Sequence, residues 1–364
     1  MTLEPRPGIM GIAPYVGGES KAAGVNRIIR LASNENPLGP SPLAIAAYEA
    51  EKSQLHRYPD GGATELRQAL AEAESLDAAN IVCGAGSDEL ISLLVRAYAG
   101  PGDEVLYSEH GFLMYAISAK TVGATPVAAP EANLTADVDG LLARVTDRTR
   151  LLFLANPNNP TGSYISESAL RRLHKGLPDH VLLVIDAAYA EYATMPDYPQ
   201  SAPLVEASDN VVMLRTFSKI HGLAALRLGW GYMPPAVADV LNRVRGPFNV
   251  SLPAQAAGIA AVRDRDHVAR SVAHNAEWLA WFTAAVSKVG IEALPSAGNF
   301  VLLRFAGGAD QAAAVLAAAK RQGILLRAMG GYGLPDCLRV TIGTEEDMRA
   351  TAEALAEAVA GAVP

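Results

Sequence analysis

The sequence predicts an α/β protein with a mostly parallel central sheet, helices on both faces of it, and a smaller α+β domain. From about residue 42 to about residue 250, short apolar runs alternate with helical patterns, and this alternation is typical of a parallel sheet covered on both faces. The runs at 151–154 and 181–185 are continuously apolar, as expected for fully buried strands. Hydrophobic residues make up 50% of the 364 positions, enough for the cores of two domains.

Glycine and proline punctuate the first forty residues, which predicts an extended arm. The elements expected beyond it are, in chain order, a helix from 42, a strand at 104–107, a helix at 114–121, strands at 125–128, 151–154, 181–186 and 210–214, a helix at 267–286, and strands at 299–303 and 338–342. A final amphipathic helix has Met348, Leu355 and Val359 on one face and Thr344 as its cap. We expect an N-terminal arm (1–40) that joins the small domain, a large domain (41–255) and a small C-terminal domain (256–364).

Composition argues against several classes of function. The formal net charge of −8 disfavours a nucleic-acid or anionic-membrane partner. Cys83 and Cys337 are too few for a disulfide framework and form no zinc motif, and His267 and His274 have no third ligand, so we expect no metal site. The N-terminus lacks an apolar signal segment, and the longest apolar run is interrupted by Asp186. We therefore expect neither secretion nor membrane insertion, and a cytoplasmic location.

Lys219 is the most informative single residue. It ends the segment 214–219, and the sequence on both sides of it is largely apolar. A desolvated lysine tends to lose its proton, and a neutral amine can attack a carbonyl group to form a Schiff base. A simpler interpretation of this segment alone is a lysine at a strand end paired with a carboxylate. The other polar segments of the chain favour a lysine that carries a cofactor.

Three further segments place polar residues at the ends of predicted strands. Residues 155–162 contain two prolines and a glycine, so they must form a loop after the strand. The apolar run 181–185 leads directly into an acid and then a tyrosine. Residues 83–91 place glycines and a serine before an apolar-periodic helix, whose N-terminus is a ready anion site. Ligands bind at the carboxyl ends of parallel strands. The side chains expected to meet there are those of Asn159, Asp186 and Lys219.

In this order and at this spacing, the four segments resemble those of fold-type I pyridoxal-phosphate (PLP) aminotransferases, and more narrowly the histidinol-phosphate aminotransferase family. The resemblance runs over nearly the whole chain, through the motifs at 12–15, 31–37, 56–59 and 338–344. Each motif alone is weak, but the ordered set is specific. The resemblance implies PLP as cofactor, an amino donor and a 2-oxo acid as substrates, and a homodimer.

The resemblance also implies roles around the cofactor ring. Asp186 would pair with the protonated pyridine nitrogen, so that the ring can accept carbanion electrons. Asn159 and Tyr189 would reach the phenolic oxygen, and Lys219 would act as acid and base on the Cα proton. Phe112 falls where many relatives have tyrosine, and it would stack on the ring without a hydroxyl.

The implied phosphate site combines a helix N-terminus with hydroxyl and guanidinium donors. Its members would be Ala85, Gly86, Ser87, Asp88, Thr216, Ser218 and Arg227. Tyr58 corresponds to a tyrosine that crosses a dimer interface to the phosphate, so that a monomer would have an incomplete site.

The substrates would be held by Arg339 and Arg327, which lie in apolar strand-like segments where an unpaired guanidinium is unfavourable. By resemblance, Arg339 binds the α-carboxylate of glutamate or the phosphate of histidinol phosphate. Arg327 supplies a second cation, with Tyr15 and Asn36 as further substrate contacts. The implied reaction converts L-histidinol phosphate and 2-oxoglutarate to imidazole-acetol phosphate and L-glutamate.

Alternatives remain open at this stage. The glycine-rich loop 329–335 is shorter than in some family members, so an aromatic amino acid or prephenate aminotransferase is the main alternative. A threonine-phosphate decarboxylase and a non-catalytic PLP-binding regulator are further ones. Among single residues, Asp186 has a salt-bridge alternative, Tyr189 a core-packing one and Ser87 a helix-cap one. His221 is expected to pack, not to act as a base.

Overall fold

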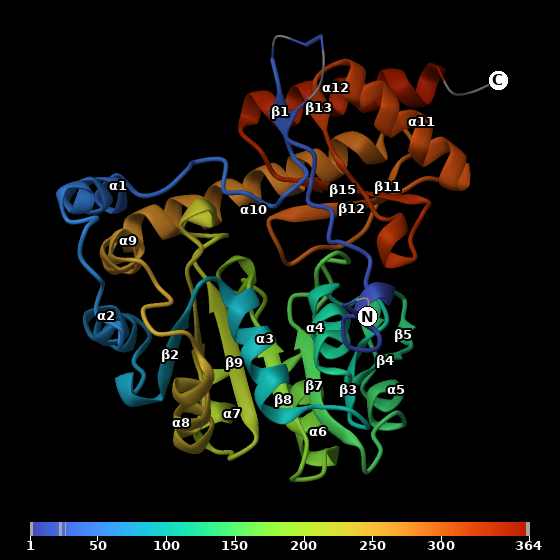
Figure 1. The fold of residues 1–364 in the computed structure, drawn as a ribbon. Coiled ribbons are helices and arrows are strands. Elements are labelled where there is room, and N and C mark those ends of the chain that lie inside the picture. The colour runs from blue at the N-terminus through green and yellow to red at the C-terminus, as the bar shows by residue number, and fades with distance from the viewer. Residues whose placement is uncertain (1–2, 22–23, 26, 362–364) are drawn as a thin grey trace.

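The computed structural model describes residues 3–21, 24–25 and 27–361, and its lower half in Figure 1 is built on a large sheet. Within the described residues this sheet has seven strands, in the order β2-β10-β9-β8-β7-β3-β4. In chain order they are β2 (Ile81–Gly84), β3 (Glu104–Ser108), β4 (Thr125–Ala129), β7 (Thr149–Ala155), β8 (Leu182–Asp186), β9 (Val211–Thr216) and β10 (Gly229–Tyr232). Only β10 runs antiparallel to its neighbours. The prediction of a mostly parallel central sheet is therefore confirmed.

Helices cover both faces of this sheet, because successive residues of each strand point to opposite sides. On one side, Val82, Leu151 and Phe153 pack with three helices, α3 (Ser87–Tyr98), α4 (Met114–Val122) and α8 (Pro235–Val244). On the other side, Leu152 and Leu183 pack with α2 (Thr64–Glu74), α5 (Val138–Leu142), α6 (Glu167–Gly176), α7 (Ala202–Glu206) and α9 (Leu252–Arg263). The helix α1 (Pro42–Ala50) packs on α9.

The upper part of Figure 1 has its own sheet and its own core. Its antiparallel strands are, in spatial order, β11 (Glu292–Ala293), β12 (Phe300–Arg304), β15 (Cys337–Thr341) and β14 (Arg327–Ala328). The helices α10 (Arg265–Ser287), α11 (Gly308–Arg321) and α12 (Glu345–Gly361) complete it. The expected cap of the last helix is confirmed, because the Thr344 hydroxyl accepts from Asp347 N–H and the Asp347 carboxylate accepts from Thr344 N–H.

The N-terminal segment connects the two parts. The strand β1 (Ile29–Arg30) pairs in parallel with β13 (Ile324–Leu325) of the upper part, and the segment before it runs down along the front of the molecule (Figure 1). A short hairpin, β5 (Glu131–Ala132) and β6 (Thr135–Ala136), flanks the large sheet. No described helix is long and apolar enough to cross a membrane.

Candidate active site

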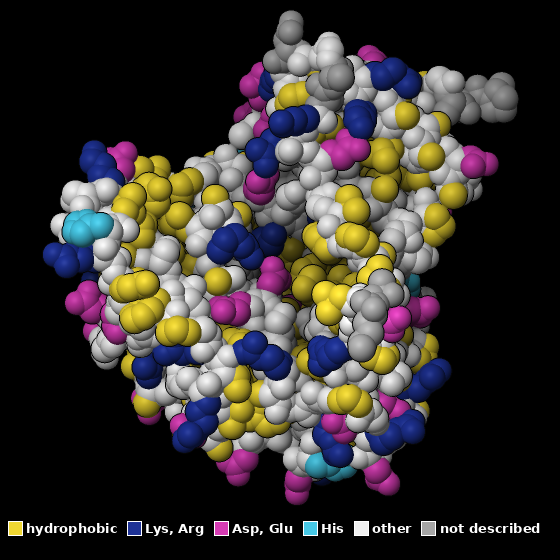
Figure 2. Space-filling view, viewed as in Figure 1, with side chains coloured by type: hydrophobic (Ala, Val, Ile, Leu, Met, Phe, Trp, Pro, Cys, Tyr) yellow, Lys and Arg dark blue, Asp and Glu magenta, His cyan; other side chains and the backbone are white. Residues whose placement is uncertain are grey.

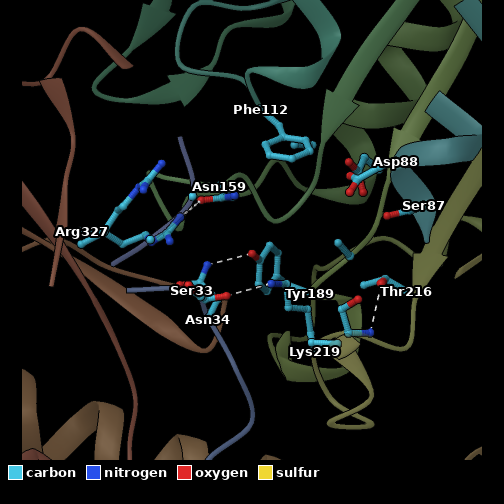
Figure 3. A pocket seen from close by; sticks show the side chains of 18 of the residues that line it. Ser33, Asn34, Ser87, Asp88, Phe112, Asn159, Tyr189, Thr216, Lys219 and Arg327 are labelled. Atoms are coloured by element: carbon cyan, nitrogen blue, oxygen red, sulfur yellow. Dashed lines mark hydrogen bonds between the residues drawn. The ribbon is translucent and has the colours of Figure 1, made fainter. Parts of the chain in front are cut away.

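The surface is hollowed between the two parts of the molecule, and basic side chains border this hollow in Figure 2. A cavity there is lined by residues from the N-terminal segment, from the carboxyl ends of the large sheet's strands and from the small sheet. The sequence-predicted residues that line it are Tyr15, Ser87, Asp88, Phe112, Asn159, Asp186, Tyr189, Thr216, Ser218, Lys219, Arg227, Arg327 and Arg339. The tertiary structure thus brings most of the predicted site residues to one place (Figure 3).

Lys219 lies just beyond the end of β9, and its half-buried side chain lines this cavity. Desolvation and, after it, the nearby Arg339 guanidinium lower the pKa of Lys219 to about 8. The Lys219 Nζ donates to Ser33 O at 3.1 Å and lies 5.8 Å from the centre of the Tyr189 ring. Among the described residues, no carboxylate is a hydrogen-bond partner of this amine. Its contacts therefore differ from those of the strand-end salt bridge that the local sequence alone left open.

Asp186 ends β8 with only 6% of its surface exposed. The Tyr115 hydroxyl donates to Asp186 Oδ2 at 2.7 Å, whereas Asp186 Oδ1 is buried without a hydrogen-bond partner. Burial raises the pKa of Asp186 to about 6, and the Tyr115 hydrogen bond opposes this rise. The acid forms no salt bridge with a described arginine, and its unpartnered, buried Oδ1 is an acceptor that suits a cationic N–H group.

Tyr189 lies on the opposite wall, where its ring meets Phe300 edge to face at 5.1 Å. Its hydroxyl accepts a hydrogen bond of 2.8 Å from Asn34 Nδ2, as Figure 3 shows. Burial raises the pKa of Tyr189 well above its ordinary value. Tyr189 is therefore a protonated hydroxyl at neutral pH and can donate a hydrogen bond into the cavity.

An anion cradle lies at the N-terminus of α3. Gly86 precedes this helix with φ +86°, and a Cβ there would lie 2.5 Å from Arg227 Nη2. The positive φ strains any other residue at this position, and a side chain there would also push the Arg227 guanidinium away from the helix N-terminus. Arg227 also reaches Asp88 Oδ2 at 3.1 Å and lies 3.5 Å from Ser218 Oγ. Helix dipole, guanidinium and hydroxyl converge on one point, which is the arrangement that binds a phosphate group.

Two arginines enter from the small sheet. Arg339, on β15, is 6% exposed and donates to Asn159 Oδ1 and, at 2.9 Å, to Ala32 O. Its Nε is buried without a hydrogen-bond partner, so this guanidinium has donor capacity left. Arg327, on β14, donates to Val16 O at 2.6 Å. The two cations favour an anionic substrate between them.

Aromatic rings form the remaining wall. Phe112 meets Tyr15 edge to face at 6.5 Å, and Tyr332 lines the same space. The backbone loop of Phe112 is anchored two residues earlier, where His110 pairs with the buried Glu131 carboxylate at 2.8 Å. This pairing raises the pKa of His110.

Four predicted residues are not among those that line the cavity. Asn36 is not among the cavity residues, and its amide is engaged by Ile220 O, Ser271 Oγ and Leu38 N–H. Tyr58 is 82% exposed and stacks on Phe248 at 4.6 Å. Ala85 and Gly86 shape the backbone before α3 and contribute no side-chain donor. Among the described residues, no cluster of His, Cys, Asp and Glu could hold a metal ion.

Sequence reasoning missed other residues of the cavity wall, namely Ser33, Asn34, Tyr115 and Tyr332. Asn34 lies inside a motif that the resemblance had marked, so it could have been found. Tyr115 reads as an ordinary core residue of a helix, and nothing in its local pattern signals a contact with Asp186. Tyr332 lies in the glycine-rich loop whose length had left substrate choice open.

Comparison with known proteins agrees with this geometry. The family described as aminotransferase class I and II matches residues 26–355. Proteins named histidinol-phosphate aminotransferase from Rhodospirillum centenum and Paramagnetospirillum magneticum are each 58% identical, over 98% of this chain and 99% and 98% of their own. The crystal structure of histidinol-phosphate aminotransferase from Sinorhizobium meliloti, in complex with pyridoxal-5'-phosphate, superposes with a TM-score of 0.91 at 30% identity, covering 99% of both chains. The chain therefore belongs to the aminotransferase class I and II family, and within it to the histidinol-phosphate aminotransferases.

Proposed function

We propose that this chain is a PLP-dependent aminotransferase that passes the amino group between L-histidinol phosphate and 2-oxoglutarate. The observation that carries the proposal is the convergence of a buried amine, a buried acid with a free oxygen, and a phosphate cradle in one cavity that two arginines also enter. The names of the full-length relatives support the choice of substrates and a place in histidine synthesis.

The described residues fit PLP. Asp186 Oδ1 is a buried acceptor without a partner, as a pyridinium N–H requires. The cradle between Gly86 and Arg227 would hold the phosphate group. Phe112 would stack on the ring from the side of the aromatic wall, and the Lys219 amine would carry the aldehyde carbon. When bound, PLP supplies an electron sink that stabilises negative charge at the substrate Cα.

The chain's own contribution is proton transfer and binding. The Lys219 amine would be the base that takes the proton from the substrate Cα and the acid that returns it. Its lowered pKa of about 8 suits this role near neutral pH. Tyr189 and Asn159 would hydrogen-bond the phenolic oxygen.

The arginines would hold the other end of each substrate. Arg339 has an unused buried donor and would bind the α-carboxylate of glutamate. Arg327 would pair with the distal carboxylate of glutamate or with the phosphate of histidinol phosphate, which has no carboxylate. One pair of cations would thus accept two different anions in turn.

A second candidate activity, aromatic amino acid or prephenate transamination, is favoured by the cavity wall of Phe112, Tyr15 and Tyr332. Such a wall accepts a benzene ring as readily as an imidazole ring.

We also propose that two copies of the chain form the enzyme. Hydrophobic side chains gather on the side of the molecule that carries α1 and α9 (left in Figure 2). The large exposed ones in and near α1 and around Phe248 are Leu43, Ile45, Tyr48, Leu55, Tyr58 and Phe248. An exposed patch of this kind marks an interface. In a symmetric pair, Tyr58 of each copy would reach the other copy's phosphate cradle.

We place the enzyme in the cytoplasm. Both cysteines are free and buried, which suits a reducing compartment.

The deciding experiment mixes the PLP-loaded enzyme, without a keto acid, with L-histidinol phosphate and separately with L-phenylalanine, and follows the loss of the cofactor's visible absorbance band. Faster conversion by histidinol phosphate, by about 10²-fold or more in kcat/KM, supports the proposed donor. Equal or faster conversion by phenylalanine would replace it with the aromatic activity. Carbon dioxide release from threonine phosphate without a keto acid would identify a decarboxylase instead. The variant Lys219→Ala controls for all of these and should not turn over.

A further inference from the structure

Asn34 and Thr341 form a closed set of hydrogen bonds behind Tyr189. The Asn34 side-chain Nδ2 donates to the Tyr189 hydroxyl at 2.8 Å, and the Asn34 backbone N–H donates to Thr341 Oγ1 at 2.9 Å. Thr341 Oγ1 also lies 3.1 Å from Asn34 Oδ1. The three residues are at most 4% exposed, so each polar atom depends on these partners.

The donor and acceptor roles in this set follow from which groups the buried Thr341 hydroxyl meets. Its oxygen accepts from the Asn34 backbone N–H, and Asn34 Oδ1 is the acceptor within this set for its single proton. With Oδ1 turned toward Thr341, Nδ2 faces Tyr189 as a donor. The Tyr189 oxygen therefore accepts from behind, and its own proton is left for a partner on the other side.

The partner lies on the cavity side, because Tyr189 lines the cavity. We propose that Asn34 and Thr341 are positioning residues that fix the direction of the Tyr189 hydroxyl proton, so that it is donated to the phenolic oxygen of bound PLP. This inference rests on the proposed function, because that function supplies the acceptor. Asn34 lines the cavity beside Tyr189, whereas Thr341 is not among the cavity residues; the proposed effect of both on the cofactor passes through the Tyr189 hydroxyl.

The backbone explains why asparagine occupies this position. Asn34 has φ +56°, a left-handed conformation that asparagine and aspartate tolerate better than other side chains. Aspartate has the same shape but no donor, and it would accept the Tyr189 proton instead of directing it into the cavity. Of the two residues, only asparagine donates a hydrogen bond to the Tyr189 oxygen and so leaves the Tyr189 proton for the cavity side.

The same backbone segment also contacts the substrate arginine. Ala32 O accepts from Arg339 Nη2 at 2.9 Å, and Leu31 O accepts from Thr341 N–H at 2.9 Å. Thr341 and Arg339 are two residues apart on β15, so they lie on the same face of the strand. The strand that presents the substrate cation therefore also sets the orientation of Tyr189.

The test is a titration of the visible absorbance band of the bound cofactor against pH. A hydrogen bond from Tyr189 stabilises the phenolic oxygen in its anionic form and so keeps the titration midpoint low. Charged and titratable groups that also act on Tyr189 are Arg339 and Tyr332 from the small sheet side and Asp186 from β8, with Lys219 beneath its ring. None of these is altered in the variants below.

Thr341→Val removes the hydroxyl at nearly constant volume and leaves Asn34 free to turn its amide over. We expect the midpoint to rise by about one pH unit. Thr341→Ser keeps the hydroxyl and should titrate like the wild type. In a Tyr189→Phe background, which lacks the proton in question, Thr341→Val should cause no further rise.

A Thr341→Val enzyme with a wild-type titration midpoint would overturn the inference. So would a midpoint that Thr341→Val raises equally in the wild-type and the Tyr189→Phe backgrounds. If Thr341→Val does not bind the cofactor, Asn34→Asp is the deciding variant. Its titration midpoint is compared in the wild-type and Tyr189→Phe backgrounds, and this comparison separates the effect of the hydrogen bond from that of the added charge. A wild-type protein that takes up no PLP would instead refute the proposed function.

Discussion

The Tyr115 hydroxyl donates a 2.7 Å hydrogen bond to Asp186 Oδ2, whereas Asp186 Oδ1 is buried without a hydrogen-bond partner among the described residues. The Tyr115 ring is held in turn by stacking on Phe153, with ring centres 4.6 Å apart. Because Tyr115 is fully buried on α4, the orientation of the acid depends on how this helix packs on the sheet. A core tyrosine thus belongs to the site without lying at its reacting centre.

We predict that Tyr115→Phe weakens PLP binding by about 10- to 100-fold, because a hydrogen bond to a charged group contributes ~1.5–3 kcal/mol. The hydrogen bond lowers the pKa of Asp186, so its loss raises that pKa above about 6, and the deficit should grow as the pH falls toward 6. The measurement is the dissociation constant of PLP from pH 5.5 to 8, a range that includes that pKa.

Tyr107→Phe is the matched control. The Tyr107 ring also packs against Tyr115, at 6.3 Å, but its hydroxyl makes no hydrogen bond to Asp186. An equal loss of affinity in both variants would show that packing, and not the hydrogen bond, is responsible.

Capture of PLP by the apoenzyme should depend on the proton of Lys219. The pKa of this amine is lowered to about 8, and only the neutral amine, present above that pH, can attack the aldehyde. We expect the rate of capture to rise with pH and to level off above about 8, as measured by stopped-flow absorbance.

The same experiment on Arg339→Gln tests the cause of the lowered pKa. The Arg339 cation lowers the pKa of Lys219, so its removal should move the inflection of the rate profile to higher pH. An inflection that moves to lower pH, or a rate without any pH dependence, would contradict this assignment of charges.

The two arginines that we propose to bind the substrates, Arg339 and Arg327, should differ in their effects. Arg339→Lys should lower kcat/KM for the glutamate half-reaction by about 30-fold or more, because truncating one partner of a buried charged contact costs about 2–5 kcal/mol. Arg327→Gln should affect histidinol phosphate more than phenylalanine, because only the former brings a dianion. The measurement is the single-turnover rate with each donor. Arg304→Gln, which alters a small-sheet surface arginine paired with Glu292, should leave every rate unchanged.

Hybrid dimers would test the proposed interface role of Tyr58. Lys219→Ala and Tyr58→Ala should each be nearly inactive alone. After unfolding and refolding as a mixture, half of the dimers contain one copy of each, and each such dimer has one site with both residues intact. About a quarter of the wild-type activity per subunit should return. If no activity returns although mixed dimers form, Tyr58 does not serve the neighbouring site.

The sequence by itself determined the layers of the large sheet and the residues at its carboxyl edge. The apolar runs at 151–154 and 181–185 can be buried only between two layers of helices, so Asp186 and Asn159 had to lie where those strands end. Lys219 follows the predicted strand at 210–214, so it was expected at the same edge of the sheet. The ordered motifs also identified the family, which the comparisons confirm.

The tertiary structure alone decided how these side chains are oriented. Tyr115 reaches Asp186 across 71 residues of sequence, and Asn34 reaches Tyr189 across 155. No local period encodes such contacts, because helix and strand periodicities report only which face of an element is buried. Asn36 shows the converse. Its motif predicted a contact with the substrate, but in the folded chain its amide donates to the backbone carbonyl of Ile220. Residue type and spacing select which groups are available at the site, and long-range packing determines which of their hydrogen bonds remain free for a ligand.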